Sequence, residues 1–160
     1  MTRLLWDASA LIKAFIDEEG SESADALFSN PRVAQSVTYL GYAETAAVLL
    51  RKLNGLQITR AHFREARQIL RNSVLLSTGF DLVTVENADI LDGMALTDRH
   101  NINTSDAAIL AAYLRFARYP DGEGAFLVVS DHRLGRAARS EGLSTLDPAR
   151  VSPENLPLMV

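Results

Sequence analysis

Short apolar runs alternate along the chain with longer stretches in which apolar residues recur every three or four positions. The short runs predict buried strands, and the periodic stretches predict helices with one face against a core. The expected strands are residues 3–6, 33–37, 81–85, 125–130 and 143–146. The expected helices are residues 9–16, 21–28, 39–53, 60–74, 88–97, 105–118 and 133–141, with a loop at 100–103 and a turn at 120–124. This alternation indicates an α/β fold, in which helices cover both faces of a parallel sheet of about four to five strands.

Capping residues mark the expected ends of several helices. Thr38 and Thr59 each precede a periodic stretch, where a hydroxyl can accept a hydrogen bond from the first free amides. Gly20, Gly55 and Gly142 each follow one, and glycine readily adopts the backbone conformation that ends a helix. These signals favour separate helices rather than one continuous helical array.

Composition and length fit one globular domain. The 160 residues are 48% hydrophobic and 22% charged, the balance of an ordinary soluble domain. We expect this domain at residues 1–150, followed by a C-terminal tail at 151–160. The sequence has no cysteine, no apolar run near the roughly 20 residues of a membrane helix, and no recognisable secretory signal at its start. We therefore expect a cytoplasmic protein without membrane contact, disulfides or thiolate metal sites.

The net charge of −4 excludes nucleic-acid binding driven by overall charge alone. It leaves open a nuclease whose acids surround a cation and whose arginines are grouped locally. Of the 16 basic residues, 14 are arginines, whose planar guanidinium groups suit phosphate.

Three aspartates stand where a predicted strand or loop runs into a helix. Asp7 follows the first strand, Asp106 opens its helix, and Asp131 follows the fourth strand. In a parallel sheet, ligands bind at the carboxyl ends of the strands, so these positions are candidate site residues. The alternative for each is helix capping, since an acid in a first turn gains about 0.3–1 kcal/mol from the helix dipole.

An acid also borders the expected core-facing stripe of residues 39–53. This stripe comprises Leu40, Ala43, Ala47 and Leu50, and Glu44 lies at its edge. No Lys or Arg stands three or four residues away to pair with Glu44 along the helix. An unpaired carboxylate there costs several kcal/mol unless a distant arginine or a metal ion neutralises it. Partial exposure to solvent is the alternative. On residues 60–74, the expected inner face is Phe63, Ala66, Leu70 and Val74.

The four acids together point to a divalent cation. At a separation of about 5.5 Å and an effective dielectric of 20, each pair of carboxylates repels by about 3 kcal/mol. A hard cation relieves this repulsion, and ligation by oxygen alone selects Mg²⁺ or Mn²⁺ over Zn²⁺. The three histidines, His62, His100 and His132, do not pair at ligand spacing.

Other classes of Mg²⁺-dependent α/β protein fit less well. Phosphatases with an aspartyl nucleophile need a second Asp two residues after the first, where this chain has Ser9. A phospho-receiver needs an acidic pair near the first strand and a late lysine, but the only lysines are Lys13 and Lys52. Glycine-rich nucleotide-binding motifs are absent from the sequence.

Four segments, in order, resemble the acidic motifs of PIN domains of the VapC toxin type. They are residues 7–13 (DASALIK), 42–45 (YAET), 105–112 (SDAAILAA) and 129–134 (VSDHRL). Residues 17–22 (DEEGSE) and 137–143 (AARSEGL) also match the usual pattern, so the likeness covers roughly residues 3–148. No single motif is specific, but the four at these spacings are.

The resemblance implies a PIN-like fold and metal-dependent endoribonuclease activity, with Asp7, Glu44, Asp106 and Asp131 holding Mg²⁺ or Mn²⁺. Products with 5′-phosphate and 3′-hydroxyl ends are the family expectation. Ser9 and Ser130 would be polar neighbours of the acids. The family commonly has Thr or Ser two residues before the fourth acid, but this chain has Val129 there, which puts one hydroxyl contact in doubt.

The resemblance also implies an RNA substrate and a cognate antitoxin, and we expect a homodimer. Arg133 and Arg136 follow Asp131 and are candidate phosphate contacts. A stripe along residues 60–74 is a second candidate, with a solvated face or a dimer contact as alternatives; it comprises Arg60, Arg64, Arg67 and Arg71. A core role or an antitoxin groove remains open for Leu11, Phe15, Leu49 and Leu53. A housekeeping PIN-type RNase and a non-catalytic PIN-like binding module are the alternative functions.

Overall fold

The computed structural model describes residues 1–118, 124–152 and 154–155, which form a five-stranded parallel sheet covered by helices on both faces. The strand order is β3-β2-β1-β4-β5, with β1 in the centre. The strands are β1 (Arg3–Trp6), β2 (Ala34–Thr38), β3 (Phe80–Val83), β4 (Ala125–Val128) and β5 (Ser144–Leu146). In the central register, Leu5 of β1 is paired with Ser36 of β2 and with Leu127 of β4. The predicted α/β class and parallel sheet are confirmed.

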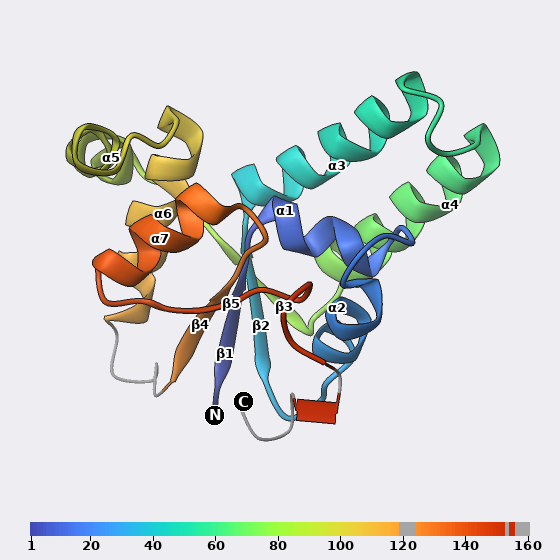
Figure 1. Ribbon diagram of the computed structural model, residues 1–160, viewed down its shortest axis with the longest axis horizontal. Helices are drawn as coiled ribbons and strands as arrows, with labels where there is room; N and C mark the ends of the chain where they lie inside the picture. Colours follow the sequence, from blue (N-terminus) through green and yellow to red (C-terminus); the bar gives the residue numbers. More distant parts are fainter. Residues whose placement is uncertain (119–123, 153, 156–160) are drawn as a thin grey trace.

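The helices divide into two groups, one on each face of the sheet (Figure 1). One group comprises α1 (Ala8–Leu11), α2 (Ser21–Phe28), α3 (Tyr39–Asn54) and α4 (Arg60–Leu70), with 3-10 helix η1 (Ile12–Ala14) and π-helix η2 (Arg71–Leu75). The other comprises α5 (Asn87–His100), α6 (Thr104–Ala117) and α7 (His132–Ser140). No helix of the described residues is both long and apolar enough to cross a membrane.

Alternation along β1 divides the core into two layers. Leu4 and Trp6 belong to the cluster under α1 to α4, whereas Leu5 belongs to the cluster under α5 to α7. This follows from the two-residue period of a strand, whose successive side chains point to opposite faces. All three side chains are fully buried, so packing on both faces fixes the position of β1. The position of Asp7, the next residue along the chain, is fixed with it.

Several predicted boundaries differ from the observed ones for local reasons. The helix expected at 9–16 ends as α1 at Leu11 and continues only as η1. Gly20 does not end that helix but precedes α2 with φ +87, and a Cβ there would lie 2.7 Å from the Ala149 nitrogen. The strand expected at 125–130 stops at Val128, and the helix expected at 60–74 widens into the π-turn η2 after Leu70. Most of the turn expected at 120–124 falls outside the described residues.

The core-facing stripe predicted for α3 is wrong. Ala43, Ala47 and Leu50 are exposed and Leu40 is half-buried, whereas Gly41, Thr45 and Leu49 are buried. The buried hydroxyl of Thr45 donates to the Gly41 carbonyl (2.8 Å), so a polar residue is tolerated in the core. Glu44 stands beside this face and is half-buried. On α4 and η2 the predicted face is confirmed, since Ala66, Leu70 and Val74 are buried and Phe63 is half-buried.

The end of the described chain packs on the domain. Val151, where the expected tail begins, contacts the cluster under α1 to α4, and its carbonyl accepts a hydrogen bond from the Ser23 hydroxyl (2.5 Å). Residues 153 and 156–160 lie outside the described residues.

Candidate active site

The predicted site acids come from both sides of one point in the sheet. β1 is followed directly by Asp7, and the adjacent strand β4 is followed by the segment that ends in Asp131. The chain runs outward through β2 and β3 on one side of β1 and through β4 and β5 on the other, so this is the topological switch point. Glu44 comes from α3 on one face and Asp106 from α6 on the other.

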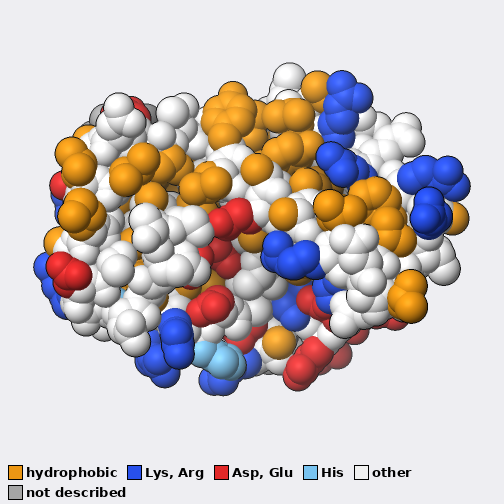
Figure 2. All heavy atoms as spheres, turned by 90° about the horizontal axis from the view of Figure 1, so that it is seen from above, with side chains coloured by type: hydrophobic (Ala, Val, Ile, Leu, Met, Phe, Trp, Pro, Cys, Tyr) orange, Lys and Arg blue, Asp and Glu red, His pale blue; other side chains and the backbone are white. Residues whose placement is uncertain are grey.

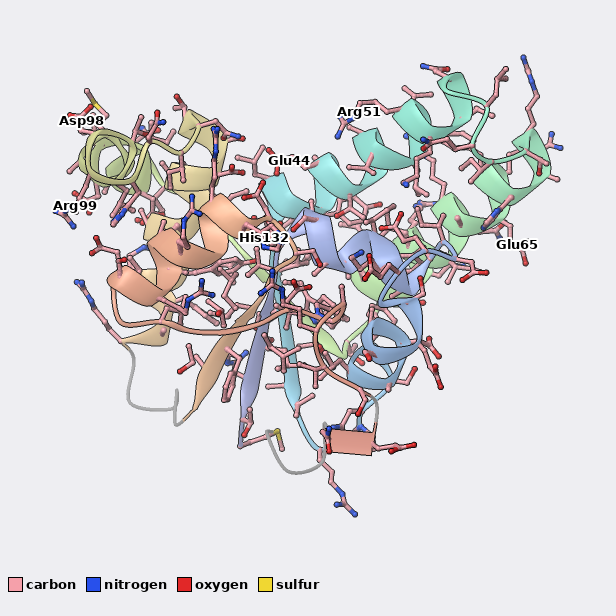
Figure 3. All side chains as sticks on the ribbon, in the orientation of Figure 1. Glu44, Arg51, Glu65, Asp98, Arg99 and His132 are labelled. Atoms are coloured by element: carbon pink, nitrogen blue, oxygen red, sulfur yellow. The ribbon has the colours of Figure 1, made fainter. Side chains whose placement is uncertain are left out.

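The molecular surface above this point is acidic. Figure 2 looks down on the carboxyl end of the sheet and shows Asp and Glu side chains gathered in a central hollow between apolar surfaces. Glu44, at the sheet end of α3, and His132, at the start of α7, both lie above the strand ends (Figure 3). The site is therefore open to a large substrate rather than enclosed.

Asp7 is the most buried of the four acids, with 4% of its surface exposed. Its Oδ2 accepts hydrogen bonds from the Ser9 amide (2.9 Å) and the Ser9 hydroxyl, and so caps α1. Burial raises the pKa of Asp7, the Ser9 hydrogen bonds lower it, and the charges of Glu44 and Asp131 raise it further. Its Oδ1 accepts no hydrogen bond from the described residues. No fully buried side-chain oxygen among those residues lacks a partner, so Oδ1 reaches solvent.

Asp106 lies in the first turn of α6 but does not cap it. Asn103 is the cap, and its Oδ1 accepts a hydrogen bond from the Asp106 amide (2.8 Å). Asn103 therefore makes the capping hydrogen bond, while Asp106 keeps the first-turn position in which the helix dipole favours an acid. Burial, followed by the charges of Asp7, Asp131 and Glu44, raises the pKa of Asp106 to about 7, against an opposing contribution from Asn103. The four acids thus act on one another electrostatically, although they come from four separate elements.

Asp131 caps α7, so the capping alternative holds in part for this residue. Its Oδ1 accepts hydrogen bonds from the Arg133 amide (2.8 Å) and the Leu134 amide (2.9 Å). Among the described residues, no hydrogen bond uses Oδ2. Each of the two capping acids, Asp7 and Asp131, therefore has one oxygen committed to its helix and one oxygen without a protein donor.

Ser9 ties these two acids together. Its hydroxyl donates to Asp7 and accepts hydrogen bonds from the amides of Ser130 and Asp131, each at 3.0 Å. Val129 is buried in the core under α5 to α7. The position where the family commonly has a hydroxyl therefore faces the core in this chain, and Ser9 contacts the segment after β4 instead.

Two residues near the acids, Tyr113 and Asp147, are not among those predicted from the sequence. The Tyr113 hydroxyl, fully buried, donates to the Trp6 carbonyl (2.6 Å) and accepts from the Thr38 amide (3.2 Å), and so joins α6 to the ends of β1 and β2. Burial raises the pKa of Tyr113. Asp147 follows β5 directly and accepts from the Ser130 hydroxyl (3.0 Å). The rule that found Asp7, an acid just after a strand, would have found Asp147 as well.

The four acids are of the ligand type that a hard divalent cation prefers, but their side chains are too far apart to hold one together. Among the described residues, no three acidic or histidine side chains lie close enough together to hold a metal ion. The donor set nevertheless suits Mg²⁺ or Mn²⁺, because it consists of four carboxylates without histidine. Both capping acids also keep an oxygen without a protein donor. Burial and, after it, repulsion by the other three acids raise the pKa of Asp106, and a cation would relieve the repulsion.

The candidate RNA contacts separate into a near group and a far group. Arg133 and Arg136 are exposed on α7, which begins directly after Asp131. Arg60, Arg64 and Arg67 are exposed on α4, which packs on α3 away from β4 and α7 (Figure 1). Arg71, also exposed, continues this stripe in η2. The structure thus places only the α7 arginines beside an acid of the site.

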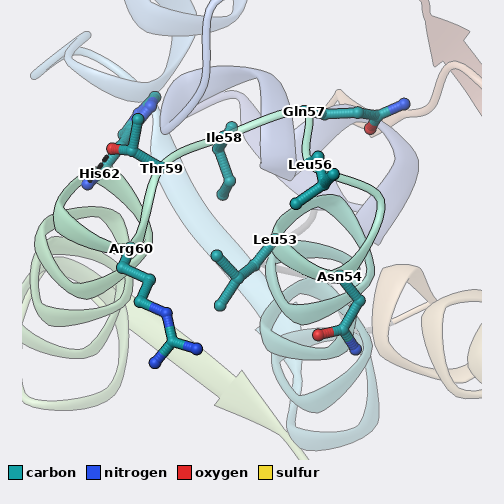
Figure 4. A pocket seen from close by; sticks show the side chains of 8 residues that line it. All are labelled: Leu53, Asn54, Leu56, Gln57, Ile58, Thr59, Arg60 and His62. Carbon is teal, nitrogen blue, oxygen red and sulfur yellow. Dashed lines mark hydrogen bonds between the residues drawn. The ribbon is translucent and has the colours of Figure 1, made fainter.

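The candidate groove residues and the larger pockets lie away from the four acids. Leu11 and Leu49 are fully buried core residues, whereas Phe15 and Leu53 are half-buried. Leu53 lines a pocket of about 700 Å³ at the turn between α3 and α4, together with Leu56, Ile58 and Arg60 (Figure 4). No carboxylate lines this pocket, so it is not part of the acidic site.

Comparison with known proteins identifies the family and agrees with the fold. The PIN domain family model matches residues 4–140, so the chain belongs to the PIN family, whose members are typically nucleases. PAE2754 from Pyrobaculum aerophilum is similar in structure, with a TM-score of 0.60 and 16% identity over 90% of this chain and 83% of that chain. A chain of a toxin–antitoxin complex from Klebsiella pneumoniae has a TM-score of 0.58 and 16% identity over 92% and 99% of the two chains. A comparison with curated protein sequences found no match.

Proposed function

We propose that this protein is a Mg²⁺- or Mn²⁺-dependent endoribonuclease and the toxin of a type II toxin–antitoxin pair. The observation that carries the proposal is that Asp7, Asp131 and Glu44 lie close enough to Asp106 to act on its charge: burial first, and then these three carboxylates, raise the pKa of Asp106 to about 7. These carboxylates oppose one another electrostatically, and a divalent cation is the ligand that relieves this repulsion. Membership of a family of nucleases supports the same chemistry.

In this proposal Asp7, Glu44, Asp106 and Asp131 hold the cation. When bound, Mg²⁺ or Mn²⁺ lowers the pKa of a water molecule and neutralises charge on the phosphodiester oxygens. Asp106 must lose its proton before it can bind a cation, because its pKa is about 7. Hydrolysis by in-line attack of water does not use the ribose 2′-hydroxyl, so we expect 5′-phosphate and 3′-hydroxyl ends.

Substrate and partner follow from the same proposal. Arg133 and Arg136 are positioned to contact phosphates beside the site, and the stripe of Arg60, Arg64 and Arg67 is a more distant RNA surface. The likeness to a chain from a toxin–antitoxin complex supports an antitoxin as the partner that restrains the enzyme in the cytoplasm. A homodimer, with α4 as one plausible contact, is part of the proposal.

Two alternatives differ from this proposal in one property each. A housekeeping PIN-type RNase would cleave RNA without an antitoxin. A non-catalytic PIN-like binding module would bind RNA or protein without cleaving. The observation in its favour is that, among the described residues, no three acidic or histidine side chains lie close enough together to hold a metal ion.

The growth of cells that express the protein distinguishes the toxin, the housekeeping RNase and the binding module. Expression of the protein alone should arrest growth, an Asp7→Asn variant at equal abundance should not, and co-expression of a small DNA-binding protein encoded directly upstream should restore growth. Normal growth with cleavage of RNA by the purified protein would favour the housekeeping enzyme. Normal growth without cleavage in Mg²⁺ or Mn²⁺ would favour the binding module.

A further inference from the structure

A small pocket lies between α7 and β5, on the β5 side of Asp131. Its volume is about 60 Å³, several times the roughly 10–15 Å³ of cavity that one water molecule needs. The pocket therefore suits a small polar group and is too small for a base or a side chain of a partner protein. Its polar lining consists of Asp131, His132, Arg139, Thr145, Asp147 and Arg150.

The charges in this pocket are only partly compensated. Asp147 accepts hydrogen bonds from the Ser130 hydroxyl (3.0 Å) and the Ala149 amide (3.1 Å), and the Arg150 Nε lies 3.5 Å from its Oδ2. Its negative charge thus has a cationic partner. Arg139, in contrast, takes part in none of the ion pairs formed by the described residues. Its Nη1 donates to a neutral group, the Thr145 hydroxyl, at 2.8 Å.

Helix geometry brings the Arg139 guanidinium back toward the acidic site. Side chains on a helix tilt toward its N-terminus, and the Arg139 Nη1 lies 3.5 Å from where a Cβ on Gly135 would be. Gly135 follows the capping Asp131 by four residues, about 6 Å along the helix axis. The guanidinium is therefore fixed about one helical turn from an acid of the site, and the absence of a side chain at Gly135 leaves room beside it.

We propose that this pocket, which we call the Arg139 pocket, binds the phosphate next to the scissile phosphate of a single RNA strand. The inference rests on the proposed ribonuclease function and adds to it a second phosphate position. A guanidinium held by one hydrogen bond keeps further donors for phosphate oxygens in a fixed orientation. Contacts of this kind position a strand without reading its bases. The pocket thus sets the register of the strand over the acids, with Thr145 fixing the orientation of Arg139.

The test is the salt dependence of RNA binding. All proteins carry Asp106→Asn so that RNA is not cleaved, and the probe is a fluorescent single-stranded RNA in Mg²⁺. Each lost phosphate contact should reduce the slope of log Kd against log salt by about 0.7. When the salt concentration is raised from about 50 to about 200 mM, RNA binding by the Arg139→Gln protein should therefore weaken about 2.6-fold less than RNA binding by the parent protein. Arg139→Lys, which keeps the charge, should retain most of the slope.

The matched control is Arg32→Gln, because Arg32 is also exposed but precedes β2 at the opposite end of the sheet. It should leave the slope unchanged. Equal slopes for Arg139→Gln and the parent would overturn the Arg139 pocket and leave the ribonuclease proposal standing. A parent protein without salt-dependent RNA binding would overturn both. Inorganic phosphate added at matched ionic strength should leave the difference in salt slope between Arg139→Gln and the parent unchanged. If added phosphate abolishes that difference, the pocket would be assigned to free phosphate instead.

Discussion

Asp106→Asn is expected to reduce RNA cleavage by about a thousandfold while leaving the metal-free protein at least as stable as the wild type. A cation at a reacting phosphate supplies several kcal/mol of charge stabilisation, and each 1.36 kcal/mol is tenfold in rate. The amide keeps the size of the side chain but removes the charge that Asp7, Glu44 and Asp131 oppose. Asn103, not Asp106, caps α6, so the substitution does not remove the cap.

Single-turnover cleavage measures the expected loss of activity, and thermal unfolding in EDTA measures the stability of the protein without metal. The control is Asp98→Asn, an exposed acid on α5 away from the strand ends (Figure 3), which should change neither quantity. An Asp106→Asn protein that cleaves normally would remove Asp106 from the site. One that unfolds readily without metal would assign it a structural role in α6.

Mn²⁺ is expected to raise the melting temperature, by more at high pH than at low pH. A ligand present at 100 times its Kd adds about 2.7 kcal/mol of stability, which corresponds to roughly 5–11 °C for a protein of this size. The pKa of Asp106 is about 7 in the folded protein against an ordinary 3.8. Its protonation therefore stabilises the metal-free fold at low pH, and this stability is lost as the pH rises toward 7. The pKa of Asp7 is raised as well, so its contribution has the same sign.

The same shift sets the pH dependence of metal binding, because proton and cation compete for the carboxylates. The Mn²⁺-dependent rise in melting temperature should therefore grow between about pH 5 and pH 8 and should flatten in Asp106→Asn. Scanning calorimetry with Mn²⁺ or EDTA across this range measures it. A rise that is absent at about pH 8, or larger at about pH 5, would contradict a metal site built from these acids.

The position of the site could be predicted from the sequence because its signals are local. Asp7 and Asp131 each follow a recognisable apolar strand, and the rule that parallel strands present their carboxyl ends at one edge brings them together. The alternating strands and helices also sufficed for the fold class. Whether Asp106 was a helix cap could not be decided from Thr104 and Ser105 alone, since the cap is Asn103, one residue earlier.

Features that depend on packing between distant elements could not be predicted. The buried face of α3 contains Gly41 and Thr45, and Gly41 packs at the end of β2, where an added Cβ would lie 3.0 Å from the Thr38 hydroxyl and 3.4 Å from Val37 Cγ2. The contacts of Tyr113 with the ends of β1 and β2 likewise appear only once α6 is placed on the sheet. Arg139 was not singled out because its position relative to Thr145 depends on how α7 packs on β5.

The most direct test of the central claim is the location of Mn²⁺ by anomalous X-ray scattering from crystals of the protein grown with this ion. We expect anomalous density bounded by carboxylate oxygens of Asp7, Asp106 and Asp131, with Glu44 at the same centre directly or through water. Density at other carboxylates only, or none at a Mn²⁺ concentration that supports cleavage, would contradict it.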